Sequence, residues 1–299
     1  MTKGVPISVV GSVNSDYSVF MKRLPRPGET VLALDSARFA GGKGFNQAVA
    51  ATRAGGDVMF RFSVGDDEDG SFLTGFLEGE SMKSVPLLDE NLKTSRAYIL
   101  VDESGENQIS VIPGANYSPK LKGFDFDDGP GFLVLQLEIG NENNLSVAKK
   151  AHQAGWTTVL TPAPWSQFDS ELLEFVDVLT LNETEAIQIA GHSDFMVSGQ
   201  VISEKVQTVF VTRGASGVAI FQDSKLVGQV DAMSVVSIDA TGAGDTFCGY
   251  VVTGLAQGLS PMEAAQLGTI AAGISVQTRG AANSIPQRSQ VDLILSGLR

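Results

Sequence analysis

Short apolar runs alternate with stretches of helical period along most of the chain. The apolar runs predict buried strands at residues 6–14, 57–67, 131–138, 157–164, 177–185 and 208–217. Between them, apolar residues recur at helical spacing in segments such as 46–55, 143–155 and 182–191. This strand–loop–helix repetition predicts an α/β fold, with a parallel sheet covered by helices on both faces. Because such folds bind ligands beyond the carboxyl ends of their strands, the loops there are the first place to look for chemistry.

Two segments interrupt this rhythm. Residues 15–40 have strand-like patches, two prolines and no helical period, and residues 94–115 alternate like two strands around a turn at 102–106. We expect them to form a small β-sheet that projects from the main domain, either as a lid over a site or as a surface for pairing subunits. The main domain is then predicted to comprise residues 1–14, 41–93 and 116–299.

The composition is that of a globular protein with a large core: 43% of the 299 residues are hydrophobic and 18% are charged. A net charge of −13 argues against a nucleic-acid-binding surface, which would need clustered Lys and Arg. The single cysteine, Cys248, excludes an internal disulfide and is expected to be a buried helical residue. No apolar run approaches the ~18 residues that span a bilayer, and the first residues do not resemble a signal peptide, so we expect a cytoplasmic protein.

A glycine-rich turn at residues 241–245, Thr-Gly-Ala-Gly-Asp, precedes an apolar helical stretch. Backbone N–H groups at such a helix start form an anion site, and Gly242 and Gly244 let an oxyanion approach the main chain. Asp245 is then either an ordinary helix cap or a catalytic carboxylate. Residues 212–217, Thr-Arg-Gly-Ala-Ser-Gly, are a second candidate phosphate loop, although a plain tight turn has the same pattern.

Two further polar segments follow predicted strands. Residues 41–46, Gly-Gly-Lys-Gly-Phe-Asn, are not a Walker A motif, because Ala37 and Gly44 stand where Gly and Ser or Thr are required. The segment suits a polar ligand against the backbone, with the Asn46 amide as a partner, or a simple strand-to-helix turn. Asn14 and Asp16 suit vicinal hydroxyls, or a turn. The missing G-x-G-x-x-G motif argues against an NAD enzyme.

Asn182 and Glu185 lie at another strand-to-helix junction. An amide and a carboxylate there could hold the water shell of Mg²⁺, but a helix-capping pair would look the same. The two histidines, His152 and His192, are expected at the surface, which argues against a Ser-His-Asp triad or a His-rich metal site.

The order of these motifs resembles the ribokinase-like (PfkB) carbohydrate kinase family over essentially the whole chain. The matching motifs are Asn14-x-Asp16, Gly41-Gly42-Lys43-Gly44-x-Asn46, Asn182-x-x-Glu185 and Asp239-x-Thr241-Gly-Ala-Gly-Asp245. The resemblance implies a three-layer α/β/α sandwich with a small β-sheet lid, which often joins two subunits into a homodimer. It also implies transfer of the γ-phosphoryl group of ATP to a primary sugar hydroxyl, and the pattern is most similar to members that phosphorylate D-ribose.

The same resemblance implies roles for individual residues. Asp245 becomes the catalytic base, beside an anion hole formed by the N–H groups of Gly242, Ala243 and Gly244. The sugar site is implied to comprise Asn14, Asp16, Gly42, Lys43, Asn46, Glu138 and Asp245. The nucleotide site is implied to comprise Asn182, Thr212, Arg213, Gly214, Ala215, Ser216, Gly217, Gly244 and Thr269. Glu185 would act on Mg²⁺ through water, and a monovalent cation, usually K⁺, would be held by Asp239, Thr241, Ser275, Thr278, Gly280 and Ser284.

The sequence departs from the ribose-phosphorylating pattern at several places, including the form Ala-Thr-Gly-Ala-Gly-Asp at 240–245 and a short region around 192–203. Phe45 replaces a small residue, and Thr161 stands where Asn is usual in the segment Thr-Pro-Ala-Pro. Fructose, a keto-deoxy sugar acid or a nucleoside are therefore alternative acceptors, and Phe45 offers a ring on which a nucleobase could stack. A catalytically silent sugar or nucleotide sensor is the alternative from a different class, and the intact Asp245 motif argues against it.

Overall fold

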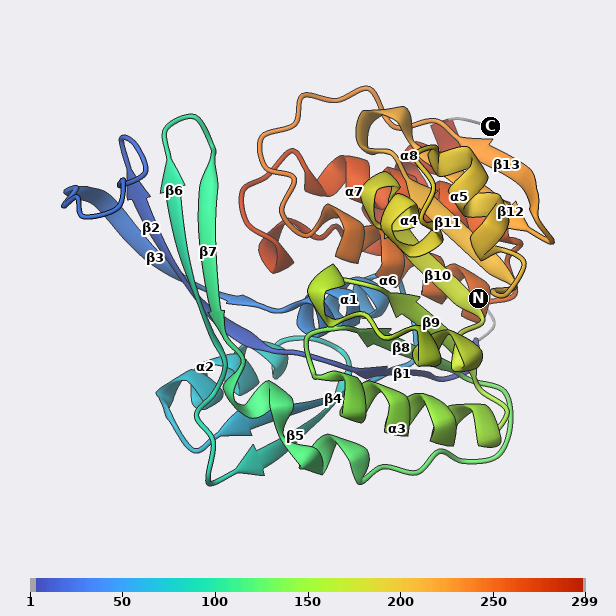
Figure 1. Cartoon of the computed structure of the whole chain (residues 1–299), viewed down its shortest axis with the longest axis horizontal. Helices are drawn as coiled ribbons and strands as arrows, with labels where there is room; N and C mark the ends of the chain where they lie inside the picture. The colour runs from blue at the N-terminus through green and yellow to red at the C-terminus, as the bar shows by residue number, and fades with distance from the viewer. Residues whose placement is uncertain (1–3, 298–299) are drawn as a thin grey trace.

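Nine strands form the central sheet of the computed structural model, which describes residues 4–297 (Figure 1). Their order across the sheet is β13-β12-β11-β10-β9-β8-β1-β4-β5. All neighbouring strands pair in parallel except that β12 is antiparallel to both β11 and β13, so the mainly parallel sheet is confirmed. The strands are β1 (Ile7–Val10), β4 (Val58–Gly65), β5 (Lys83–Asp89), β8 (Phe132–Gln136), β9 (Thr157–Thr161), β10 (Val178–Asn182), β11 (Thr208–Thr212), β12 (Val218–Gln222) and β13 (Lys225–Val230).

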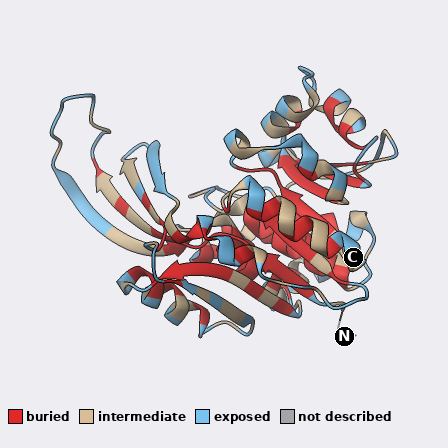
Figure 2. Ribbon diagram, turned by 60° about the horizontal axis from the view of Figure 1, so that its bottom comes forward, coloured by how far each residue is buried: buried red, intermediate tan, exposed pale blue. Residues whose placement is uncertain are grey.

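Helices cover both faces of this sheet, as predicted. Successive strand residues point to opposite faces, so Val9 of β1 joins one hydrophobic cluster and Val10 joins the other. The first cluster includes residues of α1 (Lys43–Arg53), α2 (Glu68–Leu77), α6 (Ala243–Ala256), α7 (Pro261–Ser275) and α8 (Arg288–Gly297). The second includes residues of α3 (Asn141–Gln153), α4 (Glu183–Ala190) and α5 (Phe195–Ile202). The fold is thus a three-layer α/β/α sandwich with a buried sheet (Figure 2).

A second, four-stranded sheet projects from the edge of the sandwich (Figure 1). Its order is β3-β2-β6-β7, with β2 and β6 parallel and the other pairs antiparallel. The strands are β2 (Asn14–Met21), β3 (Ala33–Gly41), β6 (Arg96–Asp102) and β7 (Asn107–Ile112). They arise from the two segments that interrupt the sequence rhythm, and we refer to this sheet as the lid.

Several predicted strands are too long, because each predicted run includes the loop that follows the strand. The run at 6–14 ends as a strand at Val10, and the chain then crosses to the lid, where β2 begins at Asn14. The runs at 177–185 and 208–217 end as strands at Asn182 and Thr212. Because the strands end earlier, the candidate site residues in these runs lie at or beyond the strand ends of the central sheet.

Other predictions concern single residues and the membrane. Cys248 is buried in α6, and burial raises the pKa of its thiol to about 11. His152 and His192 are both exposed. Among residues 4–297, none of the helices combines the length and apolar character needed to cross a bilayer.

Candidate active site

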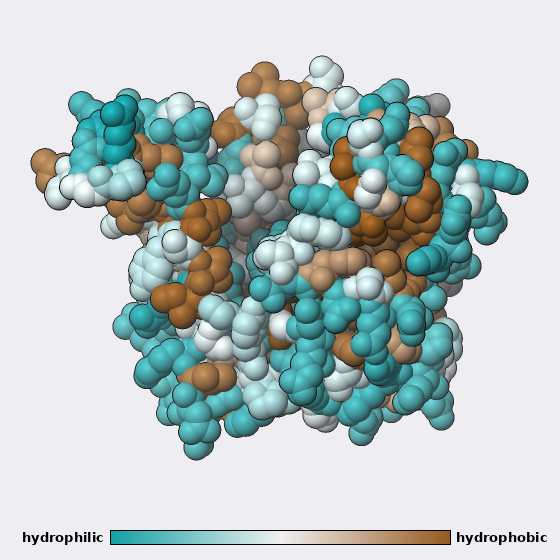
Figure 3. Space-filling model, viewed as in Figure 1, coloured by the Kyte–Doolittle hydropathy of each residue, from teal (hydrophilic) through white to brown (hydrophobic). Residues whose placement is uncertain are grey.

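Close packing of α1 against α6 creates the centre of the candidate site. A Cβ at Gly249 of α6 would lie 2.4 Å from the Cβ of Ala50 in α1, so glycine is needed for this approach. The contact places the amino-terminal turns of the two helices together at the carboxyl edge of the sheet. Figure 3 shows the molecule hollowed between the lid and the opposite side of the sandwich. The predicted motifs therefore converge in space, although they are far apart in sequence.

Asp245 lies in the first turn of α6 and is buried, with 6% of its surface exposed. The Asn46 Nδ2 group donates to Oδ2 of Asp245 at 3.2 Å, and the Gln47 Nε2 group donates to Oδ1 at 2.9 Å. Gly242 precedes the helix with a left-handed φ of 74°, which favours glycine. The first N–H groups of a helix have no partner within it, although Ala243 N donates to Ala240 O, just before the helix, at 3.2 Å. The arrangement holds one carboxylate rigidly beside potential anion donors.

A buried polar network behind Asp245 is not predicted by the sequence motifs. Gln47 also donates to Thr161 Oγ1 at 3.1 Å and accepts from Gln136 Nε2 at 2.7 Å, while the hydroxyls of Thr161 and Thr180 lie 2.7 Å apart. Thr161, which departs from the family pattern, thus orders the glutamine that holds Asp245. The only sequence signal was the unusual threonine itself.

Glu138, just beyond β8, is fixed by two hydrogen bonds. Its Oε2 accepts from Ser12 Oγ at 2.5 Å and from the Lys43 backbone N–H at 2.9 Å. Ser12 was not predicted, because 126 residues separate it from Glu138. The negative charge of Asp245 raises the pKa of the Lys43 ammonium despite its burial, with Glu138 and Glu185 acting in the same direction. Lys43 is therefore a cation surrounded by predicted site carboxylates.

Asn14 and Asp16 reach the site from the root of the lid. Asn14 Oδ1 accepts from Ser95 Oγ at 2.7 Å and from Asn116 Nδ2 at 2.9 Å, which fixes the orientation of its amide. Burial, together with the charge of Glu138, raises the pKa of Asp16 from its usual 3.8 to about 7.

Gly41 leaves space for the Asp16 carboxylate. A Cβ at Gly41 would lie 2.1 Å from Asp16 Oδ2, so the carboxylate would have to shift if residue 41 carried a side chain. Among the described residues, Asp16 Oδ1 is buried without a hydrogen-bond partner. An orphaned buried carboxylate oxygen suits a donor supplied by a ligand, such as a hydroxyl.

The junction at Asn182 is a helix cap. Asn182 N donates to Glu185 Oε2 at 2.8 Å, and Glu185 N donates to Asn182 Oδ1 at 2.9 Å, the reciprocal pattern of a capping box. The pKa of Glu185 is raised by burial and also by the charge of Asp245, so this carboxylate lies within electrostatic reach of the site centre. A single carboxylate of this kind fits Mg²⁺ that keeps its own water shell.

The loop at 212–217 begins directly beside Asn182, because Thr212 and Asn182 are partners in the β10–β11 register. Arg213 N donates to Gly217 O at 2.7 Å and closes a tight turn, in which Gly214 and Gly217 have positive φ. Residues Ala215 and Ser216 lie within this turn. Thr269 of α7 has a buried Oγ1 without a partner among the described residues.

The predicted cation ligands lie in two segments, 239–241 and 275–284, which Asp239 joins. Its Oδ1 accepts from Thr241 N and its Oδ2 from Gly280 N, both at 2.9 Å, and these bonds lower the pKa of Asp239 although burial opposes them. Ser275 Oγ and Ser284 Oγ both donate to backbone carbonyls. Between residues 4 and 297, no three or more His, Cys, Asp or Glu side chains form a potential metal cluster. Backbone and hydroxyl oxygens are the donors available for a monovalent cation.

Phe45 does not face a ligand, contrary to the expectation of an aromatic ring for stacking. Its side chain is fully buried and packs against Phe60 and Phe76, with ring centroids 6.5 and 5.2 Å away. Lys43 and Asn46 face the site from other positions around α1, and Phe45 points into the hydrophobic core between α1 and the sheet. The apolar phenyl ring gains more from this burial than from an open polar cleft.

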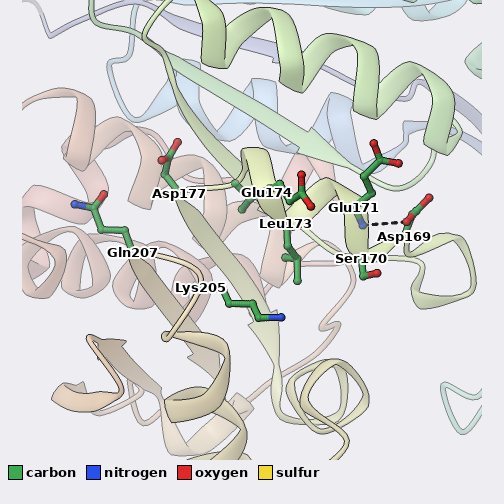
Figure 4. Close-up of a pocket in the computed structure, with 9 residues that line it drawn as sticks. Asp169, Ser170, Glu171, Leu173, Glu174, Asp177, Lys205 and Gln207 are labelled. Carbon is green, nitrogen blue, oxygen red and sulfur yellow. Dashed lines mark hydrogen bonds between the residues drawn. The ribbon is translucent and has the colours of Figure 1, made fainter.

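A separate surface pocket lies at the opposite edge of the sheet (Figure 4). It has a volume of about 780 Å³ and is lined by residues that precede β10 and β11, including Asp177 and Lys205. The candidate residues follow these strands, so this pocket is not part of the candidate site.

Comparisons with known proteins identify the family to which the chain belongs. The family model described as pfkB family carbohydrate kinase matches residues 6–288. A ribokinase from Haemophilus influenzae is 34% identical over 296 residues, covering 95% of this chain and 96% of the relative. The crystal structure of a ribokinase from Thermotoga maritima superposes with a TM-score of 0.88 at 33% identity, over 98% of this chain and 99% of the other.

A structure of Arabidopsis thaliana ribokinase complexed with ribose and ATP superposes with a TM-score of 0.82 at 29% identity, over 98% of this chain and 99% of that one. The family match extends from the first strand to the start of the last helix and includes every motif of the candidate site. This chain belongs to the pfkB family of carbohydrate kinases.

Proposed function

We propose that the protein is an ATP-dependent kinase that phosphorylates the 5-hydroxyl of D-ribose. The observation that carries this proposal is the buried carboxylate of Asp245, fixed by Asn46 and Gln47 at the start of α6. Its neighbour Lys43 and the glycine-rich turn supply positive potential for a phosphoryl group. The relatives named ribokinase support ribose as the acceptor.

In the proposed reaction, Asp245 orients the attacking hydroxyl and accepts its proton. Phosphoryl transfer passes through a loose transition state, so positioning and charge stabilisation dominate. The N–H groups of Gly242, Ala243 and Gly244 stabilise negative charge on the transferred group. Burial of Asp245 keeps bulk water from competing with the sugar.

The sugar and the nucleotide occupy opposite sides of Asp245 in this proposal. The unpartnered oxygen of Asp16 accepts a hydrogen bond from a sugar hydroxyl. Glu138 and the Asn14 amide, whose orientations are fixed by hydrogen bonds, bind other hydroxyls of the sugar. We assign ATP to the strand ends that carry Asn182 and Thr212, which are register partners. The remaining members of the sugar and nucleotide sites are those that the family resemblance implies.

We further propose two metal sites. Glu185 would hold Mg²⁺ through water, and Mg²⁺ would neutralise charge on the ATP phosphates. K⁺ would bind among the oxygens of the two segments that Asp239 joins, beside the anion hole.

The lid, from residues 15–40 and 94–115, would cover the sugar. Its exposed apolar residues would pair with a second copy: Leu32, Leu34, Ile109, Val111 and Ile112.

An ADP-release assay with ribose, deoxyribose, fructose and nucleosides tests this function, with and without K⁺ and Mg²⁺. We expect the highest kcat/KM with ribose. A clear preference for a nucleoside would contradict the acceptor assignment, and ADP release with none of the compounds would contradict the kinase assignment.

The elevated pKa of Asp16 predicts opposite effects of Asp16→Asn on stability and on binding. Because its pKa rises from 3.8 to about 7 on folding, the Asp16 carboxyl takes up a proton when the protein folds at a pH between these two values. Its contribution to the free energy of unfolding is therefore lost as the pH rises through this range. Asp16→Asn should therefore raise Tm relative to wild type at about pH 8, and by less at about pH 5.5. It should also weaken ribose binding, measured by calorimetry, because Asn cannot replace the charged acceptor.

Wild-type ribose affinity should fall as pH decreases below about 7, because the carboxylate form accepts the sugar hydroxyl. Thermal denaturation and ribose titration at both pH values provide the measurements. A Tm difference that is the same at both pH values would show that Asp16 is ionised in the free protein.

A further inference from the structure

A buried carboxylate at the root of the lid is bound by side chains from three lid strands. Asp69 lies in the first turn of α2, and 1% of its surface is exposed. Tyr17 of β2 donates from its hydroxyl to Oδ1 at 2.7 Å, and Arg96 of β6 donates from Nε to Oδ2 at 2.5 Å. Arg38 of β3 donates to Oδ1 as well. One residue of the sandwich thus contacts β2, β3 and β6 of the lid.

Arg38 is wedged between the lid and α2. Its guanidinium lies 4.2 Å from the ring centroid of Phe72 in α2, a cation–π distance, and its Nε donates to Ser15 Oγ at 2.8 Å. A second carboxylate of the same helix end, Asp67, accepts from both N and Oγ1 of Thr94, just before β6. The start of α2 therefore holds the root of the lid through two carboxylates and one stacked arginine.

This attachment lies one residue away from the proposed sugar contact Asp16. Successive residues of β2 point to opposite faces, so Ser15 and Tyr17 face α2 while Asp16 faces the site. In the lid register, Tyr17 pairs with Arg38 and with Tyr98. The Tyr17 ring stacks on the Tyr98 ring and lies under the Arg38 guanidinium, so all three side chains are on the α2 side of the lid. A displacement of β2 on that side moves the Asp16 carboxylate by a comparable distance.

We propose that Asp69 is a positioning residue for the sugar site: its carboxylate clamps the lid strands to α2 and thereby fixes Asp16 against the sugar. This inference rests on the proposed function of Asp16 in sugar binding. An ion pair with a buried carboxylate adds little net stability compared with apolar packing, so we infer that the function of this one is to fix geometry. The Asp69 cluster lies at the base of the lid, where a small shift changes the site most.

Asp69→Asn tests the clamp, with Asp177→Asn as the matched control. Asn keeps the shape of the side chain but loses the charge and one acceptor position for the two arginines and the tyrosine. Asp177 also accepts a hydrogen bond, from Thr158 N at 2.8 Å, but it lies at the opposite edge of the sheet, away from the lid. We expect the ribose KM of Asp69→Asn to rise about tenfold or more, with a smaller change in kcat, because charged hydrogen bonds are lost. The KM of Asp177→Asn should stay within about twofold of wild type.

Hydrogen exchange of the lid provides a readout that needs no catalysis. Amides of β2, β3 and β6 should exchange faster in Asp69→Asn than in wild type or Asp177→Asn. If Asp69→Asn does not fold, Tyr17→Phe removes a single hydrogen bond and should still raise both KM and lid exchange.

Two results would overturn the clamp: unchanged KM and unchanged exchange in the Tyr17 and Asp69 variants, or an equal rise of KM in the Asp177 control. If wild-type protein does not phosphorylate ribose, the proposed function is wrong. The exchange comparison then still decides whether Asp69 holds the lid.

Discussion

Asp245→Asn is expected to lower kcat for ribose phosphorylation by about 10²–10⁴-fold, the contribution typical of a general base. The fold should survive, because Asn has the same shape and its environment can adapt. Asn46 Oδ1 is buried without a partner among the described residues, so the Asn46 amide can flip and accept from the new NH₂ group. Gln47 can continue to donate to the remaining oxygen. The variant thus removes proton acceptance and little else.

Coupled ADP release gives kcat, and calorimetry gives the ribose affinity of the same variant. We expect Asp245→Asn to have the Tm of the wild type and a ribose affinity within about threefold of it, so that the substitution lowers mainly kcat. A rate within about tenfold of wild type, in a variant that folds normally, would refute the assignment of Asp245 as the base.

Gly44→Ala should cost about 3 kcal/mol or more of unfolding free energy, because the added methyl group would overlap the backbone of a neighbouring segment. A Cβ at Gly44 would lie 2.6 Å from Gly11 Cα and 2.6 Å from Ser12 N. Both are backbone atoms just beyond the end of β1, so relief requires α1 to move away from the sheet. Since Ser12 also holds Glu138, the displacement would disturb the sugar site as well.

Gly75→Ala provides the control, because Gly75 is exposed in α2 and its added Cβ would meet no atom within 4 Å. Alanine should stabilise this helix by about 0.5–1 kcal/mol relative to glycine. Urea denaturation of both variants measures the difference. If Gly44→Ala loses less than about 1 kcal/mol, then α1 can move more easily than the packing indicates.

The parallel sheet could be predicted from the sequence because its strands are buried on both faces and read as continuous apolar runs. Neither α2 nor β5 has so clear a pattern. In α2, Gly70 and Gly75 weaken the helical signal, and the edge strand β5 contains Pro86. Both elements owe their structure to tertiary packing, which local pattern does not reveal.

The motifs identified most of the candidate site, but the contacts that order it depend on distant residues. The bonds from Ser12 to Glu138 and from Gln47 to Asp245 span 126 and 198 positions. At Asn182 and Glu185, capping and metal binding need the same residue types, so only the structure reveals the cap. Phe45 was misjudged because its sequence position does not say which side of α1 it occupies.

The pairing of α1 with α6 has a consequence for synthesis of the protein. Asn46 lies in the first sixth of the chain and Asp245 in the last fifth, and their side chains meet only after α6 docks. A nascent polypeptide that has not yet reached α6 has no complete reaction centre. Enzymatic competence therefore cannot arise during translation before α6 has been synthesised and has docked against α1.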